Sequence, residues 1–169
     1  SSDVCSSDLN LRFKPSHVYS PINKDELIDI LEKHKSGKIR VVASKHSWSG
    51  LIESEDVLID MSHFDYVKIQ EKDHKTSVTV GAGCKVKKLL ADLNRKGLTI
   101  PSVGLIDQQT IAGATATGTH GSGKHSLSHY IESLQLACFD ENAKSAQIID
   151  ITDGVALQAA RCSLGCLGV

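Results

Sequence analysis

Residues 109–123 read Gln-Thr-Ile-Ala-Gly-Ala-Thr-Ala-Thr-Gly-Thr-His-Gly-Ser-Gly (QTIAGATATGTHGSG), a run of small and hydroxyl-bearing residues. The pattern has too few large side chains to favour a helix or a buried strand. Successive backbone N–H groups in such a loop can form a concave anion-binding nest, and glycine allows a ligand to approach closely. About ten small residues make a poor exposed loop unless something packs on them. The stretch therefore predicts a diphosphate-binding loop, with a pair of tight surface turns as the alternative.

A second loop of this kind is expected over Ala43–Gly50, which reads ASKHSWSG. It follows the short apolar run Ile39–Ala43 and again offers backbone N–H groups beside serine hydroxyls. The two small-residue loops, at residues 43–50 and 102–123, each follow an apolar segment, and a diphosphate ligand needs a surface of this kind.

Helices and strands interleave around the two loops. Asn23 and Glu26 form a capping-box pattern that opens an amphipathic helix ending near Gly37. A second helix is predicted from Val86 to Gly97, and a third begins near residue 155. Strands are predicted over residues 39–43, 57–60, 66–70, 76–80, 131–139 and 146–151, the last two joined by a turn at Asp140-Glu141-Asn142. The order predicts an α+β fold of two lobes, divided near residues 75–100.

Composition restricts the function classes. The chain has 169 residues, of which 40% are hydrophobic and 23% charged, values that exclude a disordered or collagen-like chain. Lys and Arg number 19 against 20 Asp and Glu, so no basic excess favours nucleic-acid binding. No apolar run reaches membrane-spanning length, and no secretory signal is visible. Five scattered cysteines indicate reduced thiols, and hence a cytoplasmic location: Cys5, Cys84, Cys138, Cys162 and Cys166.

The two ends differ from the rest of the chain. Residues 1–9 (SSDVCSSDL) show no helical or strand period, so we expect a non-native or disordered segment there. Residues 10–169 are expected to form one domain. The final residues lack a capping signal, which predicts that the chain is cut within a longer protein.

A nucleotide-binding P-loop is the alternative of another class. Gly118, Gly123 and Lys124 match most of G-x-x-x-x-G-K-[ST], but His125 stands where a hydroxyl must ligate magnesium. The preceding residues 112–117 also make a poor strand, which a P-loop requires.

Histidine spacing raises the question of a metal site. His120, His125 and His129 follow one another at intervals of five and four residues, and His46 lies upstream. No cysteine or carboxylate stands beside them at ligand spacing, so solvated loop histidines are expected and no metal is predicted.

Three segments, taken in order, resemble flavoproteins of the vanillyl-alcohol oxidase superfamily. Val41–Ser49 resembles the R-V-x-G-x-G-H-S-x-S loop, and residues 109–123 resemble the second flavin loop, T-[IV]-[AG]-G-x-x-x-x-x-x-H-G-S-G. Residues 159–169 (AARCSLGCLGV) are similar to the closing A-R-x-x-L-G-x-L-G-V. The nearest groups are the gulono- and arabinono-1,4-lactone oxidases and the alditol oxidases.

This resemblance implies a two-lobed FAD-binding domain of the PCMH type, with FAD extended between the lobes. It also implies that His46 bonds covalently to the flavin. Ser44 and Lys45 stand where the family commonly has glycine, which leaves the course of the first loop open. The implied cofactor-binding residues are Ala43, Ser44, Lys45, His46, Ser47, Ser102, Gly104, Gln109, Thr110, Gly113, Thr117, Gly118 and His120.

The implied reaction is hydride transfer from a carbinol carbon of a sugar lactone or polyol to the flavin, with O2 as the final acceptor and hydrogen peroxide as product. The resemblance places catalytic acids and bases in the C-terminal substrate domain, so none is named here. It places Gly104 over the flavin as a possible oxygen gate, against the simpler role of a turn residue after Pro101. A dehydrogenase of the same fold, with a cytochrome or quinone acceptor, is the nearest alternative.

Overall fold

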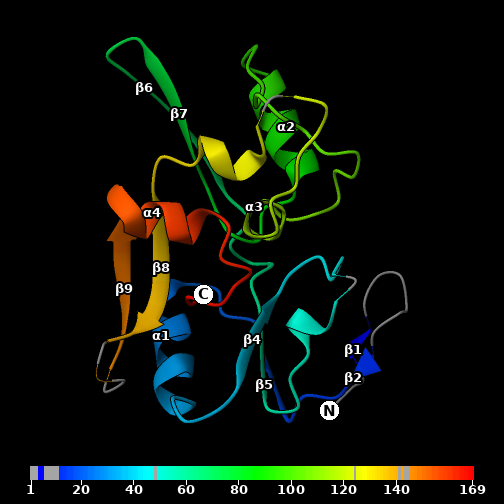
Figure 1. Ribbon diagram of the computed structural model, residues 1–169, viewed down its shortest axis with the longest axis vertical. Coiled ribbons are helices and arrows are strands. Elements are labelled where there is room, and N and C mark those ends of the chain that lie inside the picture. Colours follow the sequence, from blue (N-terminus) through cyan, green and yellow to red (C-terminus); the bar gives the residue numbers. More distant parts are fainter. Residues whose placement is uncertain (1–3, 6–11, 48, 124, 141, 143–144) are drawn as a thin grey trace.

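The computed structural model describes residues 4–5, 12–47, 49–123, 125–140, 142 and 145–169 (Figure 1). Three parallel strands form the first layer, in the order β3 (His17–Tyr19), β5 (Val57–Asp60), β4 (Ile39–Val42). The central strand is nearly continuous in hydrophobic residues and is buried, as a strand covered on both faces requires. Helix α1 (Lys24–Lys33) packs on this sheet through Leu27 and Leu31.

The antiparallel hairpin of β6 (Val67–Lys72) and β7 (Lys75–Val80) begins the second half of the molecule. Its apolar side chains pack on α2 (Val86–Asn94), around the buried residues Cys84, Leu89 and Leu93. This hairpin shares its core with α2, so the second core begins at Val67, although Ala82 after the hairpin packs against the first core. The predicted division at residues 75–100 is therefore wrong.

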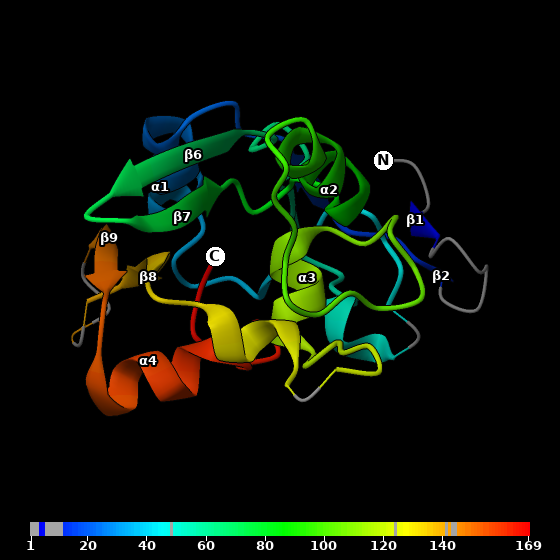
Figure 2. The same ribbon diagram turned by 90° about the horizontal axis from the view of Figure 1, so that it is seen from above.

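A third unit closes the fold. Strands β8 (Leu134–Phe139) and β9 (Ala146–Ile151) form an antiparallel hairpin, followed by α4 (Gly154–Arg161). One side of the hairpin packs on α1 and the other on α4, as Figures 1 and 2 show. The Glu32 carboxylate accepts a hydrogen bond from the Ala146 N–H, which lowers the pKa of Glu32. The final residue Val169 bonds Ala137 in both directions, so residues far apart in sequence share the first core.

Most predicted elements are confirmed within about three residues. The Asn23 side chain accepts from the Glu26 N–H at 2.9 Å, while the Glu26 carboxylate accepts from the Ile22 N–H at 2.9 Å. Strand β3 is missed because it has only three residues and its Val18 is exposed. Residues Val4–Cys5 form β1, paired with β2 (Arg12–Phe13), although no strand pattern is present in residues 1–9. Glu141 of the predicted turn lies outside the described residues.

No helix in the described ranges is long and apolar enough to cross a bilayer.

Candidate functional site

The first loop leaves the end of β4, on the side nearer to α3 in Figure 1, and residues 43–47 are half-buried in it. Lys45 has a φ of 56°, the left-handed conformation that glycine adopts without strain. The chain therefore keeps a glycine-like backbone at a position where it carries a lysine.

The Ser44 hydroxyl oxygen is buried and has no hydrogen-bond partner among the described residues. A buried hydroxyl of this kind is expected to meet a partner such as a ligand oxygen. Trp48 lies outside the described residues.

The second loop folds back on itself. Ser102 is buried, and its hydroxyl accepts a hydrogen bond from the Gly121 N–H at 3.3 Å. A Cβ on Gly121 would overlap the Val103 carbonyl oxygen, and one on Gly104 would lie 2.8 Å from Thr119 Cγ2. The two segments therefore lie in contact, and small residues are required where they meet.

A hollow of about 530 Å³ lies over this contact. It is lined by Val103, Gly104, Leu105, His120, Gly121 and Ser122. The His120 Nδ1 atom lies 3.0 Å from the Gly121 carbonyl oxygen, which is an acceptor, so Nδ1 is the donor in this contact. The structure thus brings together Ser102, Gly104 and His120 from the predicted site.

The centre of residues 109–123 forms a short helix, α3 (Ile111–Ala116), where the sequence predicts a loop. Thr110 caps it by accepting from the Gly113 N–H at 3.4 Å. The Thr115 hydroxyl donates back to the Ile111 carbonyl at 2.9 Å. Buried Ala114 joins Val86 and Leu127 in one core. Tertiary packing of small side chains therefore overrides weak local helix propensity.

The remaining predicted site residues lie along α3. Gln109 uses its backbone carbonyl to accept from the Val86 N–H at 2.9 Å, which attaches this segment to the start of α2. Gly113 and Thr117 are exposed, so one face of α3 is open to a ligand. Gly118 follows with a φ of 69° and ends the helix. Helix α3 directly precedes Gly118, where a P-loop requires a strand, which excludes the P-loop alternative. Lys124 lies outside the described residues.

The downstream histidines do not gather around His120. The rings of His125 and His129 stack on each other with centroids 3.9 Å apart, and both are exposed. In the part of the chain that the structure describes, no three His, Cys, Asp or Glu side chains form a group able to hold a metal.

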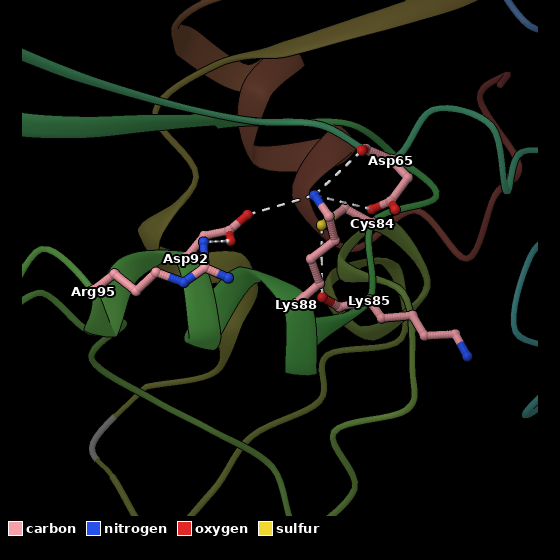
Figure 3. Close-up of polar contacts among 6 residues, drawn as sticks. All are labelled: Asp65, Cys84, Lys85, Lys88, Asp92 and Arg95. Carbon is pink, nitrogen blue, oxygen red and sulfur yellow. Dashed lines mark hydrogen bonds and ion pairs between the residues drawn. The ribbon is translucent and has the colours of Figure 1, made fainter.

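A charged cluster runs along α2 and includes Asp65 from the segment before β6, and no sequence motif indicates it. Lys88 Nζ lies 3.6 Å from an Asp65 carboxylate oxygen and 3.5 Å from one of Asp92, which also pairs with Arg95 (Figure 3). Partial burial would lower the pKa of Lys88, but the two carboxylates outweigh burial and raise it. Burial, assisted by Asp65, raises the pKa of the nearby Cys84 thiol to about 11. Cys84 is therefore a protonated, structural thiol.

Thr119 and Gly121 lie against the predicted site residues Gly104 and Ser102, and the predicted set of cofactor-binding residues does not include them. The sequence feature that could have indicated these two residues is the run Gly-Thr-His-Gly-Ser-Gly at 118–123, in which a second glycine closely follows the first. Their role depends on residues 102–104, which no sequence periodicity connects to them.

Comparison with known proteins shows the family of this chain. Residues 15–143 match a family described as an FAD binding domain. The chain belongs to this FAD-binding family. It is 46% identical over 160 residues to a long-chain alcohol oxidase from an uncultured marine euryarchaeote, covering 95% of this chain and 33% of that protein. It is 34% identical over 160 residues to L-gulono-1,4-lactone dehydrogenase of Mycobacterium tuberculosis, covering 92% and 36%.

The fold is also that of solved flavoprotein structures. A solvent-stable cholesterol oxidase superposes with a TM-score of 0.87 at 19% identity, covering 96% of this chain and 35% of that one. At this identity the likeness concerns the fold alone, which is the predicted α+β, PCMH-type domain. The chain spans about a third of the length of the curated relatives named above.

The residues present fit FAD. The unpartnered Ser44 hydroxyl offers a donor in the first loop, and the exposed Gly113 and Thr117 of α3 put no large side chain in the way of a ligand. Diphosphate is the part of FAD that such donors bind.

Proposed function

We propose that this domain holds FAD between the loop at residues 43–47 and the segment around α3, and that His46 bonds the flavin covalently. The observation that carries the proposal is the buried, unpartnered Ser44 hydroxyl two residues before His46. The Ser44 hydroxyl and neighbouring backbone N–H groups would hold the diphosphate, with Ser102, Thr117 and Gly118 on the other side. The lysine ammonium of Lys45 would add positive charge near it.

We further propose that the whole protein oxidises a CH–OH group of a sugar lactone or polyol, with O2 as acceptor. When bound, FAD supplies a two-electron acceptor for the hydride of a carbinol carbon. The proposal draws on relatives that act on lactones, among them a D-arabinono-1,4-lactone oxidase of Yarrowia lipolytica, 32% identical over 165 residues, covering 92% of this chain and 31% of that protein.

A long-chain alcohol is the second candidate substrate. Val103, Leu105 and Ile106 are exposed apolar residues beside the hollow, a surface better suited to an alkyl chain than to a sugar. Gulono-lactone, xylitol and a long primary alcohol, offered in parallel to the whole protein, separate the two. A kcat/KM highest for the long alcohol would replace the sugar proposal.

The covalent bond is tested by unfolding the FAD-loaded protein, precipitating it and measuring flavin fluorescence in the pellet. We expect the fluorescence in the pellet, and expect His46→Ala to move it to the supernatant while FAD still binds reversibly through backbone donors. His63→Ala, which changes an exposed histidine outside the loop, is the control. Wild-type flavin found wholly in the supernatant would contradict the covalent proposal.

Acceptor choice is tested at Gly104, because glycine there leaves space over the hollow for O2. Gly104→Ala is expected to slow reoxidation of the reduced flavin about tenfold, equal to about 1.4 kcal/mol in the barrier. Reduction by substrate should change little, as stopped-flow traces of the two half-reactions would show.

The alanine Cβ would lie 2.8 Å from Thr119 Cγ2, so a local shift could mimic a blocked channel. The double variant Gly104→Ala/Thr119→Ser removes that methyl group and separates the two causes. Reoxidation that recovers in the double variant, or that slows equally with reduction, would leave Gly104 as a turn residue and favour the dehydrogenase.

A further inference from the structure

Two exposed thiols flank a single tight turn after α4. The Cys166 N–H donates to the Ser163 carbonyl at 2.9 Å, and the two residues between them, Leu164 and Gly165, have φ values of 54° and 71°. This is the pattern of a type I′ turn, whose first and fourth Cα atoms lie within about 7 Å. Cys162 directly precedes the turn and Cys166 ends it, and both thiols are free and exposed.

Leu164 has a left-handed backbone conformation, which is strained for any residue that carries a Cβ atom. This strain indicates that contacts with the surrounding segments hold the turn. Arg161, just before the turn, donates two hydrogen bonds to the Ile131 carbonyl, at 2.9 and 2.6 Å. The Leu164 N–H donates to the Ala116 carbonyl at 3.1 Å. Residues 161–164 are therefore hydrogen-bonded to Ile131, which precedes β8, and to Ala116 at the end of α3.

Cys162 lies against the proposed cofactor segment. Its Sγ is 3.4 Å from the Ala116 carbonyl oxygen and 3.4 Å from where a Cβ on Gly118 would stand. Figures 1 and 2 both show the red chain after α4 passing beside α3. A change in the Cys162 side chain therefore alters the contacts at Ala116 and Gly118, the residues on either side of Thr117.

We propose that Cys162 and Cys166 form a peroxide-sensitive disulfide site that weakens FAD binding when it is oxidised. The source of peroxide rests on the proposed oxidase function, whereas the bridge itself depends only on the two thiols. A disulfide spans Cα separations of about 4.4–6.8 Å. The turn holds the Cα atoms of Ser163 and Cys166 within about 7 Å, and Cys162 is the chain neighbour of Ser163.

The oxidation needs only hydrogen peroxide. One thiolate attacks a peroxide oxygen, the O–O bond breaks, and a sulfenic acid and hydroxide form. The second thiolate then attacks the sulfenic sulfur and releases the oxygen as a second hydroxide. With the two thiol protons counted, two thiols and one peroxide yield one disulfide and two waters, and the two sulfurs lose two electrons.

Bridging turns the Cys162 sulfur toward Cys166 and away from Ala116. The end of α3 then loses its contact with the thiol, and the turn that donates to Ala116 through Leu164 is pulled inward. Cys84 offers an internal comparison because it is fully buried and its raised pKa keeps it protonated.

The test exposes the FAD-loaded chain to added hydrogen peroxide and then to a dithiol reductant. Cleavage after Arg161 places both cysteines on one peptide, in which we expect a loss of two hydrogen atoms that the reductant reverses. FAD affinity, measured by flavin fluorescence on a His46→Ala background so that binding is reversible, should fall about tenfold. Cys162→Ser and Cys166→Ser should each abolish both effects, whereas Cys138→Ser, at a half-buried thiol on β8, should abolish neither.

Sulfinic acid or intermolecular dimers in place of the internal bridge would overturn the proposal. So would a bridge that forms with FAD affinity unchanged, because the coupling to α3 would then be absent. A protein that releases no peroxide during turnover contradicts the oxidase function alone, since added peroxide would still form the bridge.

Discussion

At the scale of single residues, the two cores are joined by a close approach of backbone that only glycine permits. The Gly83 N–H donates to the Phe64 carbonyl at 3.1 Å, and a Cβ on Gly83 would overlap the Met61 carbonyl oxygen. Gly83→Ala is therefore expected to lower the free energy of unfolding by about 3 kcal/mol, the upper range for overpacking. Urea unfolding measures it, with Gly123→Ala as the control because its Cβ would meet its nearest neighbour at 3.5 Å. Equal losses in both variants would show that the overlap relaxes at low cost.

At the scale of elements, α1 connects the parallel sheet to the β8–β9 hairpin, and its first turn depends on Asn23. The Asn23 side chain satisfies the Glu26 N–H, one of the donors that a helix start leaves unpaired. Asn23→Ala should cost about 1 kcal/mol of stability, whereas Asn23→Asp should cost far less because its carboxylate also caps. Thermal unfolding followed by circular dichroism compares them. If the aspartate variant loses as much as the alanine variant, the amide contributes something other than capping.

At the scale of the whole molecule, the hollow beside Gly104 faces solvent. Leu105 at its rim is fully exposed, with a relative accessibility of 102%, and nothing among the described residues covers it. A substrate would therefore meet no second wall to orient its carbinol carbon, and orientation supplies much of the rate of such reactions. We expect this 169-residue chain to bind FAD yet to release no measurable peroxide from gulono-lactone or xylitol. Peroxide above the level of free FAD would show that these residues alone form a working substrate site.

Sequence alone predicts two segments of small residues, the order of most helices and strands, and the family. These features depend on local chemistry, such as the Asn23 cap, the buried run Val57–Asp60 and the small residues at 109–123. Each can be predicted because neighbouring residues decide it.

Three features could not be predicted from the sequence and depend on tertiary packing. Residues 111–116 form a helix, β6 and β7 share a core with α2, and Gly104 lies against Thr119. A six-residue segment of small side chains has little helical preference alone, and it gains its stability from burying Ala114 against Val86 and Leu127. Contacts between residues 102–104 and 119–121, or between Cys162 and Ala116, carry no sequence period. They exist because packing of distant segments, and not local propensity, sets where the chain turns.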